Sequence, residues 1–254
     1  PAEKPVAEPT IDLRFHWQDA LAVDTFYGRE RELELLTTCI IKEQCRVVTL
    51  LGLGGIGKST LAVYVMHQVA ENFQVVIWLS LRDLPSCDEL LIKLLQIFIP
   101  QITHGETGNF EQRLNLLMEQ LRTKQALVVL DNVESVMEEN ENTGRMRAGY
   151  EDFGQFLAQV STTRHQSTLL LTSRQKPDVL LPHEGATTQV RTLRLSALDN
   201  AACEQLLVEK WVAGSATECR DLVQSYAGNP LALKIVAQTI FDLFDGQIGA
   251  FLAE

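Results

Sequence analysis

A short run near position 55 combines glycine, lysine and hydroxyl side chains in a spacing that suits phosphate chemistry. Residues 52–60 follow an apolar segment, precede an amphipathic one, and match the pattern G-x-x-x-x-G-K-[ST] in full. In this pattern the glycines turn backbone N–H groups toward a β-phosphate, a lysine reaches the β- and γ-phosphates, and a hydroxyl ligates Mg²⁺. The run therefore predicts a phosphate-binding loop formed by Gly52, Gly54, Gly55, Ile56, Gly57, Lys58, Ser59 and Thr60.

Three further polar residues follow apolar runs and could complete such a site. Asp131 ends the run 127–130 and is the expected second Mg²⁺ ligand beside Ser59. Glu134 could orient or deprotonate an attacking water, although a solvent-exposed loop glutamate has the same signature. Arg174 follows the run 168–171 and could contact a γ-phosphate, or instead form a salt bridge across a domain junction. The catalytic candidates are thus Lys58, Asp131, Glu134 and Arg174.

Short apolar runs that alternate with amphipathic segments must position these residues. The expected buried strands are 47–51, 75–79, 126–130 and 168–171. Their alternation with helices predicts a doubly wound, mostly parallel α/β domain over 25–194. Beyond it the strand signal stops, and 195–254 is expected to form a small all-helical domain. The proline-rich start makes 1–24 a linker or N-terminal extension in this interpretation.

Capping signals mark the starts of several predicted helices. Ser86 with Glu89 forms a capping-box pattern, and so does Ser215 with Glu218. Asn109 is expected to cap the helix that carries an apolar face at 114, 117, 118 and 121. In the C-terminal part, Gly228 ends one helix and Asn229-Pro230 begins the next, with proline at the tolerated first position.

Composition excludes several classes of protein. The 254 residues are 46% hydrophobic and 22% charged, which is ordinary for a globular chain of one large or two smaller domains. The net charge of −11 would repel a nucleic-acid backbone, so no direct nucleic-acid contact by this segment is expected. With no apolar stretch of membrane-span length and no signal sequence, the interpretation is a cytoplasmic protein without a membrane partner. Five scattered cysteines indicate neither a disulfide framework nor a zinc site.

Five motifs follow one another in a specific order over roughly residues 24–241. They are FYGRE at 26–30, the glycine-rich loop at 52–60, the run ending at Asp131, LTSR at 171–174, and GNPLAL at 228–233. This order resembles the NB-ARC group of STAND ATPases. Within that group the chain is most similar to the NB-ARC regions of cyanobacterial proteins that carry WD40 or other repeats downstream.

The resemblance implies an adenine-nucleotide switch with ADP or ATP and Mg²⁺ as ligands. In that family the turn equivalent to Phe26, Tyr27, Gly28 and Arg29 contacts the adenine. The motif equivalent to Pro230 closes over the nucleotide, with Leu231 as a neighbour. The resemblance further implies ADP held in a closed state, exchange for ATP when downstream sensor repeats detect a ligand, and homo-oligomerisation on activation. A winged-helix domain normally follows, so the helical part is expected to be truncated before it.

Asn132 departs from the family pattern, because plant-type and apoptotic members usually carry a second aspartate at that position. An amide cannot act as a general base. Hydrolysis is therefore expected to be slow at most and to rely on Glu134, as an acidic residue three places on does in the related NACHT group. Two alternatives stay open from the sequence: a turnover-driven AAA-type ATPase, and the nucleotide-binding part of a transcription regulator.

Overall fold

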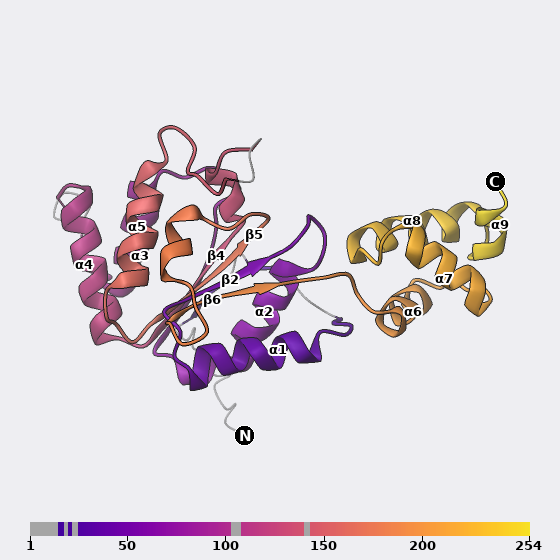
Figure 1. Cartoon of the computed structure of the whole chain (residues 1–254), viewed down its shortest axis with the longest axis horizontal. Coiled ribbons are helices and arrows are strands. Elements are labelled where there is room, and N and C mark those ends of the chain that lie inside the picture. Colours follow the sequence, from indigo (N-terminus) through magenta and orange to yellow (C-terminus); the bar gives the residue numbers. More distant parts are fainter. Residues whose placement is uncertain (1–14, 18–19, 22–24, 103–107, 140–142) are drawn as a thin grey trace, which may run out of the picture.

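The computed structural model describes residues 15–17, 20–21, 25–102, 108–139 and 143–254. It shows an α/β region and, beyond it, a lobe made only of helices (Figure 1). The proline-rich segment expected to act as a linker, Pro1–Pro9, lies outside the described residues.

A six-stranded sheet forms the centre of the α/β region, with every strand pair parallel. The strand order is β1-β3-β4-β5-β2-β6. The strands are β1 (Phe15–His16), β2 (Val47–Leu51), β3 (Val75–Ser80), β4 (Ala126–Asp131), β5 (Thr168–Ser173) and β6 (Val190–Arg194). The predicted doubly wound parallel sheet is confirmed. In this order β5 lies between β2, which leads into the glycine-rich loop, and β4, which ends in Asp131.

The four strands expected from the sequence are the four central ones, and both edge strands were missed. β6 has only two apolar residues among its five and is mostly half-buried, so it lacks the continuous apolar run of a central strand. β1 has only two residues, paired in parallel with Val76 and Ile77 of β3. The segment interpreted as a linker or extension before residue 25 thus contributes a strand to the edge of the sheet.

Helices cover both faces of the sheet (Figure 1). The longer helices of the α/β region are α1 (Glu30–Thr37), α2 (Lys58–Val69), α3 (Cys87–Phe98), α4 (Phe110–Thr123) and α5 (Glu151–Thr162). Shorter turns are η1 (Thr38–Lys42), which is π-helical, and the 3₁₀ turns η2 (Ala70–Asn72), η4 (Val133–Val136) and η5 (Asp178–His183). The capping box predicted at Ser86 begins α3, and Asn109 caps α4 as predicted, where it also forms a capping box with Gln112.

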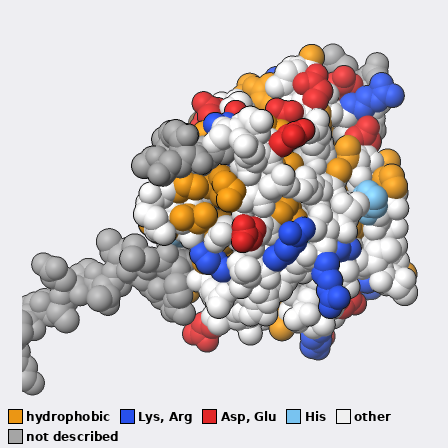
Figure 2. Space-filling model, turned by 90° about the vertical axis from the view of Figure 1, so that its left-hand side faces the viewer, with side chains coloured by type: hydrophobic (Ala, Val, Ile, Leu, Met, Phe, Trp, Pro, Cys, Tyr) orange, Lys and Arg blue, Asp and Glu red, His pale blue; other side chains and the backbone are white. Residues whose placement is uncertain are grey.

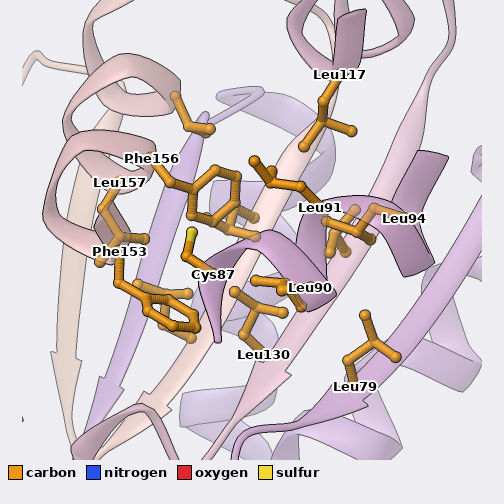
Figure 3. Close-up of a cluster of buried hydrophobic side chains, with 14 of the residues drawn as sticks. Leu79, Cys87, Leu90, Leu91, Leu94, Leu117, Leu130, Phe153, Phe156 and Leu157 are labelled. Carbon is orange, nitrogen blue, oxygen red and sulfur yellow. The ribbon is translucent and has the colours of Figure 1, made fainter. Parts of the chain in front are cut away.

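Successive strand residues enter two separate cores. On β4, Val128 and Leu130 point into a cluster with α3, α4 and α5, whereas Leu127 and Val129 pack with α1 and α2 on the other face. Because side chains alternate across a strand, burial on both faces explains why the central strands are apolar without interruption. Figure 3 shows the first cluster, where Phe153, Phe156 and Leu157 of α5 lie against side chains of α3 and the sheet.

The C-terminal lobe contains its own apolar core. Its helices are α6 (Asn200–Glu209), α7 (Ala216–Ser225), α8 (Pro230–Leu243) and α9 (Ile248–Leu252). Their buried side chains include Leu206, Leu222, Leu233 and Ile240, and Tyr27 from the α/β region packs against them. The predicted capping box at Ser215 begins α7, and Asn229 caps α8 with Pro230 in its first turn.

The surface carries charges of both signs. Acidic and basic side chains both occur on the face shown in Figure 2. Among the helices of the described ranges, none is both long and apolar enough to cross a membrane.

The core under α5 should dominate the stability of the α/β region. Phe156 is 1% exposed, so Phe156→Ala removes a buried ring and leaves a cavity. We expect the free energy of unfolding to fall by about 3–5 kcal/mol, measured by chemical denaturation. Phe241→Ala, at a ring that is 42% exposed, is the matched control and should lose less than half as much. Equal losses in the two variants would contradict this assignment of the core.

Candidate functional site

The glycine-rich loop connects β2 to α2 in a conformation that only flexible residues adopt easily. Gly55 and Gly57 have φ of 74° and 98°, in the left-handed region that favours glycine. The helix begins at Lys58, as predicted, and no side chain of the described residues caps its first N–H groups. Uncapped N–H groups and the positive end of the helix dipole form an anion-binding position.

Lys58 folds back over the loop that precedes it. Its Nζ donates to the carbonyls of Gly52 at 2.9 Å and Leu53 at 3.1 Å, and the residue is 8% exposed. Burial lowers the pKa of Lys58, while the nearby Glu134 and Asp131 carboxylates act in the opposite direction. The ammonium group is thus held at the base of the loop, where a phosphate could replace the two carbonyls as its partner.

Asp131 is the centre of a hydrogen-bond network at the carboxyl edge of the sheet. Its Oδ1 accepts from Ser59 Oγ at 2.6 Å and from Thr172 Oγ1 at 2.5 Å, and its Oδ2 accepts from Asn132 Nδ2 at 2.8 Å. The predicted metal ligands Ser59 and Asp131 are therefore direct neighbours. A hydroxyl and a carboxylate are the oxygen donors that Mg²⁺ prefers, so this pair fits the metal.

Thr172 is a site residue that sequence reasoning missed. It belongs to β5, the strand between the loop strand and the Asp131 strand, and its hydroxyl also accepts from the Asn132 backbone N–H at 3.0 Å. Its position in the sequence could have identified it, because Thr172 lies at the carboxyl end of a predicted parallel strand, close to the predicted site residue Arg174.

Glu134 and Arg174 pair with each other at 3.3 Å. Glu134 lies in η4, a turn that begins after Asn132 adopts φ of 60°. The Glu134 side chain is 16% exposed and the Arg174 side chain 66%, so the arginine is the more solvent-accessible partner. Glu134 Oε2 is buried and has no hydrogen-bond partner among the described residues. The sequence left two alternatives open: that Glu134 is a solvent-exposed loop residue, and that Arg174 forms a salt bridge across the domain junction. The structure matches neither, because Glu134 is largely buried and Arg174 pairs with it inside the α/β region.

A cavity of about 360 Å³ opens between the loop and the helical lobe. Most of the predicted site residues line it, and these are Gly54, Gly55, Gly57, Lys58, Ser59, Thr60, Glu134, Arg174, Pro230 and Leu231. Asn132 lines it as well. The basic side chains around this cavity favour an anionic ligand.

Two basic lining residues, Arg82 and Lys234, were not identified from the sequence. Arg82 follows the carboxyl end of β3, as Arg174 follows that of β5, so strand position was an available signal. Lys234 lies four residues after Pro230 on α8, and one helical turn places the two on the same face.

The start of α8 is hydrogen-bonded to the glycine-rich loop. Asn229 Nδ2 donates to the Gly54 carbonyl at 2.9 Å, and the Leu231 N–H donates to the Gly55 carbonyl at 3.3 Å. The Asn229 Oδ1 accepts from Leu231 N and Ala232 N, which caps the helix. A Cβ on Gly55 would approach Leu231 Cβ to 2.7 Å. Asn229, predicted only as a helix start, is therefore also a contact between the two domains.

Gly52 and Ile56 attach the glycine-rich loop to the sheet and to the core beneath it. The Gly52 N–H donates to the Ser173 carbonyl at 3.3 Å, and a Cβ on Gly52 would approach Ile56 Cγ2 to 2.8 Å. Ile56 is 4% exposed and packs with the core on the α1–α2 face. Both residues shape the loop, and neither lines the cavity beside Lys58 in the described part of the chain.

The predicted adenine-binding turn at 26–29 lies beside the junction of the two domains. Phe26 stacks on Tyr64 of α2 with ring centroids 4.2 Å apart, and Gly28 lies against Ala202 of α6. Arg29 is 8% exposed, and its Nη2 donates to the carbonyls of Ile56 at 3.3 Å and Ser196 at 2.6 Å. None of the four turn residues is among the described residues lining the cavity, so adenine contact stays a prediction.

Comparison with known proteins gives relatives that are much longer than this chain. It is 40% identical, over 93% of its length, to an uncharacterized WD repeat-containing protein of Nostoc sp. strain PCC 7120, and covers 20% of that protein. It is 22% identical to a nucleotide-binding leucine-rich repeat (NLR)-like protein of Hyaloscypha variabilis, covering 85% of this chain and 22% of that protein. The chain thus spans about a fifth of the length of the curated relatives it matches.

Solved structures share the fold. A Signal Transduction ATPase with Numerous Domains (STAND) protein with a tetratricopeptide repeat sensor from Pyrococcus horikoshii aligns with a TM-score of 0.61 and 20% identity, over 86% of this chain and 30% of that one. A Walker-type ATPase of Pyrococcus abyssi aligns with a TM-score of 0.58 and 15% identity, over 88% and 69%. At the sequence level, residues 29–195 match the NB-ARC domain. With this match over most of its length, the chain belongs to the NB-ARC family of P-loop NTPases.

Proposed function

We propose that the chain is the nucleotide-binding switch module of a STAND-type signalling protein, with an adenine nucleotide and Mg²⁺ as its ligands. The observation that carries the proposal is the contact between the start of α8 and the phosphate-binding loop, beside a cavity lined by both domains. A nucleotide in that cavity touches the α/β region through Lys58 and the helical lobe through Pro230 and Lys234. The arrangement of the two domains would then depend on whether a nucleotide is bound and on whether it carries two or three phosphates.

The physical basis of this switch is differential affinity. A ligand shifts an equilibrium between closed and open arrangements only by as much as it binds one arrangement better. Lobe residues that line the phosphate cavity interact with nucleotide only when the lobe is docked, so nucleotide favours the closed arrangement. The proposal further holds that ADP occupies this state, that exchange for ATP accompanies opening, and that opened modules assemble into homo-oligomers.

The metal site supports a Mg²⁺-dependent nucleotide complex. When bound, Mg²⁺ would neutralise phosphate charge beside Ser59 and Asp131. Thr172 and Asn132 orient the Asp131 carboxylate through their own hydrogen bonds, so its oxygens are held at this edge of the sheet. Lys58 supplies positive charge from its place beside the Gly52 and Leu53 carbonyls.

Hydrolysis in this site would be slow. Asn132 uses its amide to hold Asp131 and offers no proton acceptor toward the cavity. Glu134 is the available base, but its Oε1 is paired with Arg174. The guanidinium occupies this oxygen and Oε2 is buried, so neither oxygen is free to accept a hydrogen bond from an attacking water. Turnover therefore requires Arg174 to move, for which its exposure leaves room.

The repeats named in two of the relatives support a sensor role for the rest of the parent protein. One is a WD repeat-containing protein, and one carries a tetratricopeptide repeat sensor. We infer that this module responds to sensor repeats elsewhere in its own polypeptide rather than to a ligand in the helical lobe.

The first test is nucleotide binding by calorimetry. Stripped protein should bind ADP or ATP in preference to GDP or GTP. Lys58→Ala removes a charge-assisted phosphate contact that contributes on the order of 1.5–3 kcal/mol, so affinity should fall at least about tenfold. Lys42→Ala, at an exposed lysine outside the cavity, is the control and should bind like the parent. Parental affinity in folded Lys58→Ala would rule out the phosphate-site assignment.

A second test separates domain coupling from helix capping. Asn229→Ser keeps an oxygen that can cap α8 but is too short to donate to the Gly54 carbonyl. Losing one hydrogen bond of about 0.5–1.5 kcal/mol should weaken ADP binding by about two- to tenfold and increase the radius of gyration in small-angle scattering. Asp199→Ser, at the cap of α6, is the matched control and should change neither value. An unchanged scattering profile for Asn229→Ser would argue against the coupling.

A third test concerns hydrolysis. Glu134→Gln is nearly isosteric but cannot accept a proton, so it should abolish residual ATP turnover while ATP binding is retained. The matched control is Glu139→Gln, at an exposed glutamate paired with Arg147. Phosphate release under single-turnover conditions is the measurement. If Glu134→Gln hydrolyses ATP at the parental rate, Glu134 is not the base and slow hydrolysis depends on positioning and Mg²⁺ alone.

A further inference from the structure

Two of the five cysteines, Cys39 and Cys45, lie next to each other just before β2. The Cys45 N–H donates to the Cys39 carbonyl at 2.9 Å. Their sulfur atoms and a carboxylate oxygen of Glu43 all lie within 4.8 Å of one another. The π-helical turn at 38–42 brings the two cysteines together. Their spacing in the sequence therefore did not indicate that they are neighbours. Neither cysteine lines the phosphate cavity.

The two thiols differ in access and in acidity. Cys39 is partly exposed, whereas Cys45 is 0% exposed. The side-chain interaction with Cys45 lowers the pKa of Cys39 to about 7, and the Arg191 guanidinium acts in the same direction, whereas burial and the Glu43 carboxylate act against it. The same interaction, together with burial, raises the pKa of Cys45. Cys39 is therefore the more readily ionised and the more accessible thiol of the pair, and the thiolate is the nucleophilic form.

The backbone geometry allows a bond between the two sulfurs. Disulfides require Cα atoms about 4.4–6.8 Å apart. A direct N–H···O=C hydrogen bond between the two residues keeps their Cα atoms inside that range, because only the hydrogen bond and a few covalent bonds separate them. Side-chain rotation at the partly exposed Cys39 can then bring the sulfurs together without moving β2.

We propose that Cys39 and Cys45 form a thiol pair that reacts with hydroperoxides and closes to an intramolecular disulfide. In the first step the Cys39 thiolate attacks one oxygen of hydrogen peroxide and the O–O bond breaks. Cys39 becomes a sulfenic acid, and the hydroxide that leaves takes a proton from solvent to form water.

In the second step the Cys45 sulfur attacks the Cys39 sulfur. Cys45 gives its proton to Glu43, whose Oε2 already accepts a hydrogen bond from that thiol at 3.7 Å. The S–O bond of Cys39 breaks as the S–S bond forms, and the departing hydroxide takes up the proton as water. Overall, two thiols are oxidised to one disulfide while one peroxide is reduced to two waters.

A metal ion is the competing occupant of this cluster, and the contacts disfavour it. Structural zinc sites in proteins have four ligands, whereas the described residues supply three donors here. Glu43 is moreover engaged by Arg191 Nη2 at 3.1 Å, and a guanidinium beside a site repels a cation. The positive charge instead favours the thiolate that begins peroxide reduction.

The test is peptide mapping by mass spectrometry after treating the reduced chain with hydrogen peroxide alone. We expect a peptide pair linked through Cys39 and Cys45, with a mass lower by two hydrogen atoms. Cys219 is the internal control, because it is also partly exposed but burial raises its pKa. The linked species should form at least about tenfold faster than Cys219 is oxidised.

Two variants assign the roles. In Cys45→Ser the sulfenic acid of Cys39 should accumulate and be trapped by dimedone, and Cys45→Ala serves the same purpose if the serine variant does not fold. In Cys39→Ser, Cys45 should stay reduced. Equal oxidation of Cys39 and Cys219, or the absence of trapped sulfenic acid in both Cys45 variants, would overturn the proposal. So would one zinc ion retained per parental chain after incubation with zinc alone and lost in Cys39→Ser.

Discussion

The carboxylate of Asp131 holds together the parts of the site that come from different strands. It accepts hydrogen bonds from Ser59 at the start of α2, from Thr172 on β5 and from its own neighbour Asn132. Because β5 separates the loop strand from the Asp131 strand, a direct contact between them depends on side chains that reach across β5. The strand order β4-β5-β2 therefore brings the oxygen atoms of Asp131, Thr172 and Ser59 together at this edge of the sheet. The glycine-rich loop and the turn with Glu134 lie next to this cluster.

Two polar side chains, Arg29 and Asn229, help to tie the helical lobe to this arrangement. Arg29 connects the carbonyls of Ile56 and Ser196, and so joins the loop to the segment that leads into the lobe. Asn229 joins the loop to the start of α8. The hydrogen bond from Arg29 to Ile56 is buried and the other two are partly buried, so breaking them without water access would leave costly unpaired groups. The two side chains therefore connect the loop both to the segment that enters the lobe and to the start of α8.

Much of the fold was predictable from the sequence, because buried parallel strands are apolar without interruption and helix starts carry capping residues. The central strands, the phosphate-binding loop and the cluster of Ser59 with Asp131 followed from local patterns. The edge strand β6 could not be predicted in this way, because a strand with only one neighbour needs no continuous apolar run. Lys234 and the loop contact of Asn229 were missed because they depend on how the domains pack, whereas Arg82 and Thr172 had a signal in their strand positions that was not used. The Cys39–Cys45 pair was missed because a π-helical turn has no clear sequence signal.

The close approach of Gly55 to Leu231 has a kinetic consequence. With Leu231 against the loop, and the Asn229 amide on the neighbouring carbonyl, the outer side of the loop is covered whenever the lobe is docked. Under the proposed switch, a nucleotide beneath it would leave no faster than the lobe lifts. Residence time would then be governed by the opening rate of the lobe, on the microsecond-to-second scale of domain motions or slower. A sensor attached to the lobe could therefore control exchange without touching the nucleotide.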